Sequence, residues 1–150
     1  RGRRRLDALF HRAQECVRED RSDPKTDIVS SRAPEPVGAF PHAKRVGDFL
    51  FLSGIGPRKR GSKEIPDGIE AQTLAVFKNV RLVLEDAGAS WDDIVDVTVF
   101  LTDMNADFAA FNKLYAKNFA TNRPTRTTVE VGALPTPISV ELKVIAFVKP

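Results

Sequence analysis

The order of elements predicted from the sequence places this chain in the α+β class, as a sandwich of one sheet and two helices. Apolar residues recur at helical spacing in two segments, 69–87 and 105–120. Segments rich in β-branched and aromatic residues surround them, and strands are expected at 44–46, 49–53, 95–101, 126–131 and 139–148. The resulting order, β-β-α-β-α-β-β, allows both helices to cover one face of a single sheet.

The 150 residues divide into a basic extension and one domain. Residues 1–33 hold nine of the 23 Lys and Arg and six of the 20 Asp and Glu, so 34–150 hold fourteen of each. Helical spacing predicts an amphipathic helix over 6–20, and the Pro- and Ser-containing segment 21–38 is typical of a linker. We therefore expect an extension at 1–33 and a charge-balanced domain at 34–150.

The arginine-rich start of the extension, Arg1 to Arg5, is open to several interpretations. It fits a nucleic-acid-binding arm, a remnant of an organelle-targeting segment, or a solvated tail. A cytoplasmic protein is expected, or one of an organelle matrix if the targeting interpretation holds. No apolar run approaches the roughly 20 residues of a membrane span.

The domain opens with a hairpin, because apolar runs flank the turn pair Gly47-Asp48. The Gly- and Pro-containing residues 54–68 then predict a long loop that carries Arg58-Lys59-Arg60. Gly88 is expected to end the first helix, and Ser90 to cap a short turn before the strand at 95–101.

The strand at 126–131 carries the most informative side chain. Its alternation puts Arg126, Thr128 and Glu130 on one face. An arginine on a mostly buried strand is costly to desolvate unless an anion meets it, and its planar fork matches a carboxylate. Arg126 is therefore either the receptor for a small carboxylic acid or half of a structural ion pair with Glu130 or Glu141.

The last strand is apolar on both faces. Val140, Leu142, Val144 and Ala146 share one face, whereas Glu141, Lys143, Ile145 and Phe147 share the other. Two helices cover only one face of the sheet, so the second apolar face predicts an oligomer.

Cofactor and metal chemistry find little support in the sequence. The only two histidines, His11 and His42, lie far apart, and the single cysteine, Cys16, excludes an intramolecular disulfide. The glycine motifs of nucleotide-binding loops are absent. We expect neither a metal nor a cofactor.

Several collinear motifs, from about residue 33 to 150, resemble the Rid (YjgF-type) enamine/imine deaminases. They are Phe51-Leu52-Ser53-Gly54, Ile69-Glu70-Ala71-Gln72-Thr73, Val97 to Asp103, Phe111-Asn112-Lys113-Leu114-Tyr115 and Arg123 to Val131. The resemblance implies a chorismate-mutase-like fold and a homotrimer with a barrel-like core. It also implies cofactor-independent hydrolysis of an enamine or imine acid at sites between subunits.

The resemblance also implies roles for particular residues. Arg126 resembles the arginine that binds the substrate carboxylate, and Glu141 the residue that positions water. Ser53 and Asn112 fall on positions that line the same pocket. Two departures stand out: Phe40 lies where the family often has a tyrosine, and Thr128 where a cysteine is common.

The run from Phe40 to Phe51 is similar to the 2-aminomuconate deaminase branch, whose substrate is an unsaturated amino-dicarboxylate. A second carboxylate needs a second receptor, which His42 with Arg58 or Arg60 would supply. A broad-specificity enamine/imine deaminase is the alternative. A non-catalytic or RNA-directed binding protein is another, although the charge-balanced domain lacks the basic and aromatic interleaving that stacks bases.

Overall fold

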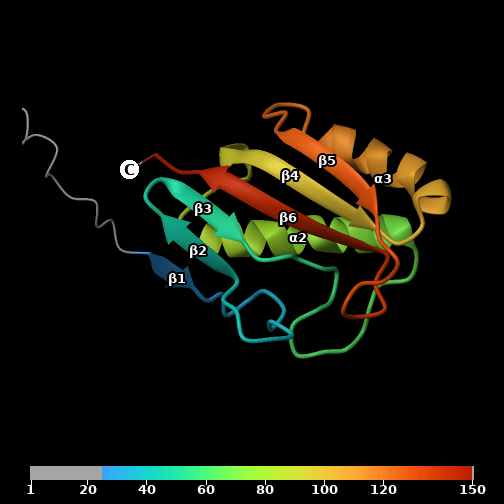
Figure 1. The fold of residues 1–150 in the computed structure, drawn as a ribbon, viewed down its shortest axis with the longest axis horizontal. Coiled ribbons are helices and arrows are strands. Elements are labelled where there is room, and N and C mark those ends of the chain that lie inside the picture. The colour runs from blue at the N-terminus through green and yellow to red at the C-terminus, as the bar shows by residue number, and fades with distance from the viewer. Residues whose placement is uncertain (1–24, 150) are drawn as a thin grey trace, which may run out of the picture.

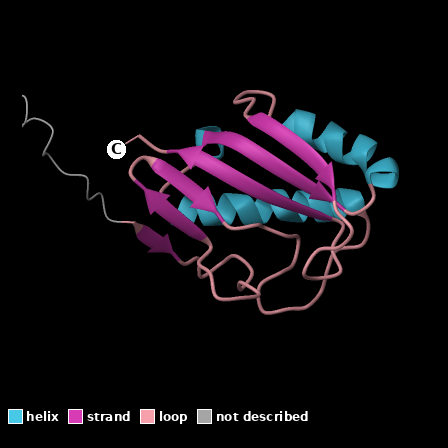
Figure 2. Ribbon diagram, viewed as in Figure 1, coloured by secondary structure: helices cyan, strands magenta, loops and turns pink. Residues whose placement is uncertain are grey.

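The structure is a computed structural model that describes residues 25–149. One sheet, with strand order β1-β2-β3-β6-β4-β5, forms its centre, and both long helices lie on the same side of it (Figures 1 and 2). The elements are β1 (Thr26–Ile28), β2 (Ala43–Val46), β3 (Phe49–Leu52), α2 (Ile69–Asp86), η1 (Trp91–Asp93), β4 (Ile94–Leu101), α3 (Met104–Asn118), β5 (Thr125–Glu130) and β6 (Val140–Phe147). The predicted α+β sandwich is confirmed.

The core lies between the sheet and the helices. On β6 the fully buried residues alternate with partly exposed ones, because successive side chains of a strand point to opposite faces. The buried stripe of α2 packs against this face of the sheet through Val76, Val80, Val83 and Leu84. Gly88, with a φ of 76°, follows the helix as predicted, since a left-handed residue ends a helix at little steric cost to glycine.

Two strand pairings fix which side chains share a face. β4 pairs in parallel with β5, through the crossover of α3, and antiparallel with β6. Val97 of β4 lies opposite Arg126 and Val144, on the helix face, whereas Phe100 lies opposite Val129 and Glu141, on the other face. β5 is the last strand, so its outer edge is unpaired within the described chain.

The sheet face without helices is partly apolar. Its exposed side chains include Val46, Phe49, Phe51 and Val129, which are 36–44% exposed. Phe49 packs edge-on against Phe147, with ring centroids 5.4 Å apart. This agrees with the apolar second face predicted from the last strand.

The start of the domain differs from the prediction. Residues 26–28, expected within a linker, form β1 and pair with β2. Beyond β1, Ser30 and Ala33 are buried, so the domain begins before the expected boundary at residue 34. The three-residue strand is too short for its alternation to be recognised beside several prolines. The helix predicted over 6–20 lies outside the described residues.

The segment after β3 is a long loop, as predicted. It joins the sheet only where Ile55 pairs with Leu142 of β6. In the described part of the chain, no helix has the length and apolarity to cross a membrane.

Candidate functional site

Arg126 belongs to β5, and its side chain lies against α3. Its Nη1 donates a hydrogen bond to Oδ1 of Asn112, at 2.8 Å. The centre of the guanidinium lies 4.6 Å from the ring centroid of Tyr115 and 5.9 Å from that of Phe108. An amide oxygen and two aromatic rings thus orient the guanidinium without neutralising its charge. The structure brings together Arg126 and Asn112, two of the predicted site residues.

The environment of β5 corrects one expectation. The strand is not mostly buried: it is an edge strand, and only Arg126 and Thr128 are half-buried. The structural ion pair is also wrong for the described chain, where Arg126 has no carboxylate within 4 Å. Glu130 instead accepts a hydrogen bond from the backbone N–H of Met104, at 2.9 Å. The guanidinium therefore keeps donors that no residue of the described chain uses.

Tyr115, whose ring contacts Arg126, and Thr128, two residues after Arg126 on β5, each carry a hydroxyl group on the helix face. Both hydroxyl groups are buried and have no hydrogen-bond partner in the described chain. Burial raises the pKa of Tyr115 to about 12, so its phenol is neutral at physiological pH. Sequence reasoning missed Tyr115, because its place in the apolar stripe of α3 marked it only as a core residue.

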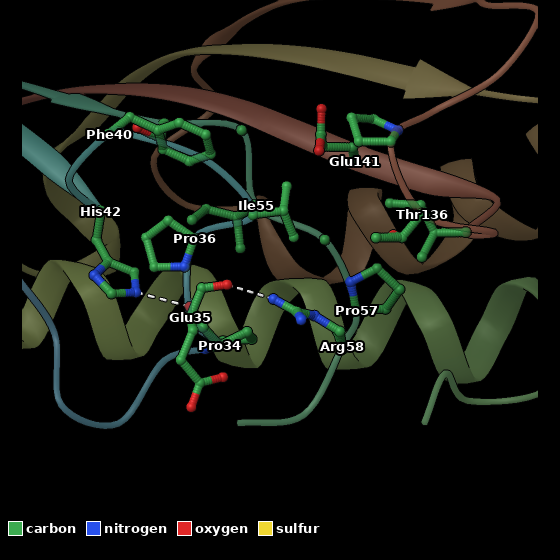
Figure 3. A pocket seen from close by; sticks show the side chains of 16 residues that line it. Pro34, Glu35, Pro36, Phe40, His42, Ile55, Pro57, Arg58, Thr136 and Glu141 are labelled. Atoms are coloured by element: carbon green, nitrogen blue, oxygen red, sulfur yellow. Dashed lines mark hydrogen bonds between the residues drawn. The ribbon is translucent and has the colours of Figure 1, made fainter. Parts of the chain in front are cut away.

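A second group of predicted residues surrounds a cavity of about 230 Å³ (Figure 3). The cavity lies between the chain around 34–42, the loop after β3 and the start of β6. Its lining is Pro34, Glu35, Pro36, Val37, Phe40, His42, Ser53, Gly54, Ile55, Gly56, Pro57, Arg58, Pro135, Thr136, Ile138 and Glu141. Most of these side chains are apolar, so the cavity suits a ligand with a small apolar part.

Glu141 is the acidic group of β6 in this lining. Its side chain is half-buried, and burial raises the pKa of its carboxyl above the usual range. It forms no hydrogen bond or ion pair with other described residues. A Cβ at Gly54 would lie 2.8 Å from Oε2 of Glu141, so the carboxylate rests directly on the glycine. A raised pKa and a free carboxylate suit a group that exchanges a proton with water.

Ser53 and Phe40 also line the cavity. The hydroxyl of Ser53 donates to the carbonyl oxygen of Pro41, at 2.7 Å, which leaves its oxygen lone pairs as acceptors. Phe40 is 42% exposed and lies on the same side of the cavity as Glu141 in Figure 3.

The cationic groups predicted for a second carboxylate are mostly engaged with the main chain. Both ring nitrogens of His42 bond main-chain atoms, so in this conformation the ring offers no atom to a ligand. Arg60 does not line the cavity and donates to the carbonyl oxygen of Ala33, at 2.9 Å. Arg58 lines the cavity and donates through Nη2 to the carbonyl oxygen of Glu35, which leaves its other guanidinium nitrogens.

The two groups of site residues lie on different sides of the sheet. Arg126 shares the helix face with Val97, whereas Glu141 shares the opposite face with Phe100. Neither Arg126 nor Asn112 lines the cavity. One ligand in a single chain therefore cannot contact both Arg126 and Glu141.

The described chain thus combines an α+β fold and a bare sheet face with two separate groups of polar residues, one around Arg126 and one around Glu141. A sequence model described as Endoribonuclease L-PSP matches residues 30–148. The chain belongs to this family, which includes the YjgF and Rid proteins.

Two curated relatives show how far the similarity extends. The RutC family protein PYRAB12510 of Pyrococcus abyssi is 41% identical over 124 residues, covering 82% of this chain and 97% of the relative. Reactive Intermediate Deaminase A of Arabidopsis thaliana, a chloroplastic protein, is 35% identical over 127 residues, covering 83% and 67%. Each of the two similarities thus covers more than four fifths of this chain.

A solved structure confirms the fold. The crystal structure of Escherichia coli TdcF with bound serine superposes with a TM-score of 0.78 at 34% identity, covering 83% of this chain and 100% of TdcF. The YjgF product of E. coli has the same fold, with a TM-score of 0.77. The predicted YjgF-like architecture is therefore confirmed for the subunit.

Proposed function

We propose that the protein is a cofactor-independent deaminase that hydrolyses small 2-imino and 2-enamino acids to 2-oxo acids and ammonia. The observation that carries the proposal is the guanidinium of Arg126, oriented by Asn112 and two aromatic rings but left without a carboxylate in the described chain. A carboxylate ligand would accept two parallel hydrogen bonds from its unused donors. The relative named Reactive Intermediate Deaminase A supports deamination as the chemistry.

The active site, in this proposal, forms between two copies of the chain in a homotrimer. Arg126 and Glu141 lie on opposite faces of one sheet, so they can act on one substrate only if each comes from a different subunit. The unpaired edge of β5 and the partly apolar bare face supply surfaces for such an interface. A cyclic trimer would repeat this contact three times.

In the reaction, Arg126 binds the carboxylate beside the imine carbon and so fixes the plane of the substrate. Water adds to the carbon of the protonated imine, and the electron pair of the C=N bond moves to nitrogen. Glu141 orients the water and accepts its proton, giving a carbinolamine. Glu141 then returns this proton to the nitrogen, the C–N bond breaks with its electron pair leaving on ammonia, and the hydroxyl group loses its proton to water as the C=O bond of the 2-oxo acid forms. An enamine substrate first becomes an imine by gaining a proton at carbon.

The cavity restricts the substrate further. Ser53 can accept a hydrogen bond from the nitrogen of the substrate, because its own proton is used by Pro41. Phe40 contributes apolar surface where a phenol is absent, and the apolar lining suits the substrate side chain. These features support a broad-specificity deaminase of small apolar imino acids.

The narrower proposal is 2-aminomuconate as substrate, and it depends on Arg58. Arg58 is the predicted cation that both lines the cavity and keeps unused donors. In a dicarboxylate-specific enzyme, Arg58→Ala lowers kcat/KM about tenfold or more for 2-aminomuconate and little for 2-iminopropanoate. Equal losses on both substrates would return the protein to the broad-specificity class.

An RNA-directed activity is the second candidate, favoured by the family description as an endoribonuclease. Its test is binding and cleavage of single-stranded RNA at several salt concentrations, since phosphate contacts give a steep salt dependence. Weak, salt-insensitive binding without cleavage would exclude it.

The test of the main proposal uses 2-iminopropanoate made in situ by an amino-acid oxidase, with ammonia release compared with the uncatalysed rate. We expect Arg126→Ala and Arg126→Lys each to lower kcat/KM by about two orders of magnitude, because a lysine cannot reproduce the two-pronged contact. Arg123→Lys, the same change at an exposed arginine, is the matched control. Near-normal activity of Arg126→Lys would rule out the carboxylate-binding role.

A further inference from the structure

One wall of the cavity is a segment with no regular secondary structure. Residues 30–37, here called the strap, run between β1 and β2, and Pro34, Glu35, Pro36 and Val37 all line the cavity. Pro34 and Pro36 have no backbone N–H, so this part of the chain cannot be held by a strand ladder. Its position must come from other contacts.

His42 supplies two of those contacts. The backbone N–H of Ser30 donates to Nδ1 of the ring, at 3.0 Å, and Nε2 lies 2.8 Å from the carbonyl oxygen of Pro34. The ring is only 4% exposed, and Ser30 only 1%. One buried imidazole therefore bonds the strap at Ser30 and at Pro34, where the cavity wall begins (Figure 3).

The two contacts require one form of the ring. Nδ1 accepts a hydrogen bond, so it carries no proton, and the neutral ring then carries its proton on Nε2, facing the oxygen of Pro34. An imidazolium would point an N–H from Nδ1 at the N–H of Ser30. Protonation thus replaces a hydrogen bond with two facing donors.

Other groups hold the strap at its first residues and along its length. The hydroxyl of Ser30 donates to Asp86 of α2, at 2.6 Å, and Arg60 of the loop donates to Ala33. The charged groups that contact the strap or belong to it are Asp86 and Glu85 from α2, Arg58 and Arg60 from the loop, and Arg32 and Glu35 from the strap itself. Of these, Asp86 interacts electrostatically with His42. These carboxylates already bond Arg32, Ser30, Arg60 or Gly61. The hydrogen bonds of the His42 ring go to main-chain atoms.

We propose that His42 is a positioning residue that sets the shape of the cavity by holding the strap, and that only its neutral ring can do so. The proposal rests on the proposed deaminase function and assigns substrate-size selection to the wall formed by Pro34 to Val37. His42 thereby acts through the strap and not by touching a substrate carboxylate.

Two substitutions separate the two contacts of the ring. The amide of His42→Gln reaches the position of Nε2 and can donate to Pro34, whereas the oxygen of His42→Asn reaches only the position of Nδ1 and keeps Ser30. For an imino acid with a large apolar side chain, we expect His42→Asn to raise KM about tenfold, and His42→Gln about twofold at most. 2-Iminopropanoate is too small to press against the wall, so both variants should change its KM about twofold or less. For both substrates, kcat should fall only where KM rises.

A second measurement needs no turnover. Hydrogen exchange of the peptide covering residues 30–37, corrected for intrinsic rates, should be faster in His42→Asn than in His42→Gln. In the wild-type protein, protection should fall at a pH low enough to protonate the ring, because Nδ1 then can no longer accept from Ser30, and in His42→Gln it should not. These exchange measurements test whether His42 holds the strap even if the protein hydrolyses no imine. A lack of turnover would refute only the proposed function.

Three results overturn the inference. One is equal strap protection in the Asn and Gln variants, and another is protection in the wild type that does not depend on pH. The third is a KM increase in His42→Asn confined to 2-aminomuconate, which would make His42 a direct carboxylate ligand. If His42→Asn fails to fold, the pH dependence of wild type against His42→Gln still decides.

Discussion

The surroundings of Arg126 favour its charged form, whereas those of Glu141 disfavour its charged form. The guanidinium of Arg126 lies against an amide oxygen and aromatic ring faces, which orient a cation and leave its charge free for an anion. The carboxyl of Glu141 lies beside Gly54 and apolar cavity residues, with no cation bound to it, so burial disfavours its charged form. Each group is thus left without an oppositely charged partner among the described residues.

The raised pKa of Glu141 predicts how activity depends on pH. If its carboxylate accepts the proton of water, kcat/KM should fall as the pH is lowered through this pKa, at a higher pH than for an ordinary glutamate. Glu141→Gln should lose most activity and this acidic limb together. A pH profile that is flat down to the ordinary range of glutamate would contradict the role.

The same pKa predicts the sign of a stability effect. The folded chain binds the Glu141 proton more tightly than the unfolded chain does, so the protonated side chain stabilises the fold. This stabilisation is fully present below the pKa of the unfolded chain. It is lost as the pH rises through the pKa of the folded chain. The Tm of Glu141→Gln minus that of the wild type should therefore grow from acid to neutral pH. Calorimetry across this range measures it, and a difference that shrinks would contradict the assignment.

Gly54 offers a separate test of where Glu141 lies. A methyl group at this position would lie 2.8 Å from Oε2 of Glu141, so Gly54→Ala must displace the carboxylate. We expect kcat to fall about tenfold or more with a small change in Tm, since the side chain can move at little cost to packing. Gly132→Ala is the matched control, because nothing lies within 4 Å of its added Cβ. Equal kcat values for the two variants would place Glu141 outside catalysis.

At the scale of elements, the strap and β1 determine where the folded domain begins. Ala33 is fully buried, and Ser30 and Arg32 both bond Asp86 at the end of α2. Removing them would expose apolar surface and leave the ring of His42 without a partner for Nδ1.

A pair of truncations tests this boundary. Deleting residues 1–33 should lower Tm by several degrees relative to deleting 1–24, because only the longer deletion removes β1 and the start of the strap. Comparison of the two truncated proteins isolates residues 25–33. Equal Tm values would restore the boundary expected from the sequence, at residue 34.

For the whole molecule, the bare sheet face predicts association. Val46, Phe49, Phe51 and Val129 are exposed there, and helices cover only the other face. Sedimentation should give a trimer of about three times the subunit mass of 16.6 kDa. Phe51→Asp should shift the equilibrium towards monomer and abolish activity. A stable, active monomer at micromolar concentration would contradict the shared site.

Subunit mixing tests whether one site uses two chains. Arg126→Ala and Glu141→Gln should each be inactive alone. Unfolded and refolded together at equal amounts, they should recover about a quarter of wild-type activity, since random cyclic trimers then pair an intact Arg126 with an intact neighbouring Glu141 at that frequency. No recovery would mean that both groups act within one chain.

Much of the fold could be predicted because it depends on local patterns. The helical stripe of α2, the alternation of β6 and the hairpin around Gly47-Asp48 each depend on residues near in sequence. The family motifs added candidate residues, and the structure brings Arg126 beside Asn112 and places Ser53 and Glu141 in the lining of one cavity. β1 was missed because three residues beside prolines carry no measurable period.

The sequence by itself determined which residues alternate along each strand, and hence that Arg126 and Thr128 share a face. Only the tertiary structure decided that this face lies against α3, while Glu141 lies on the opposite side of the sheet. It also decided that His42 bonds the strap, since Ser30 and Pro34 are brought to one ring by a turn that no periodic pattern specifies. Periodicity fixes the direction of a side chain within its element, whereas its partners depend on how distant elements pack.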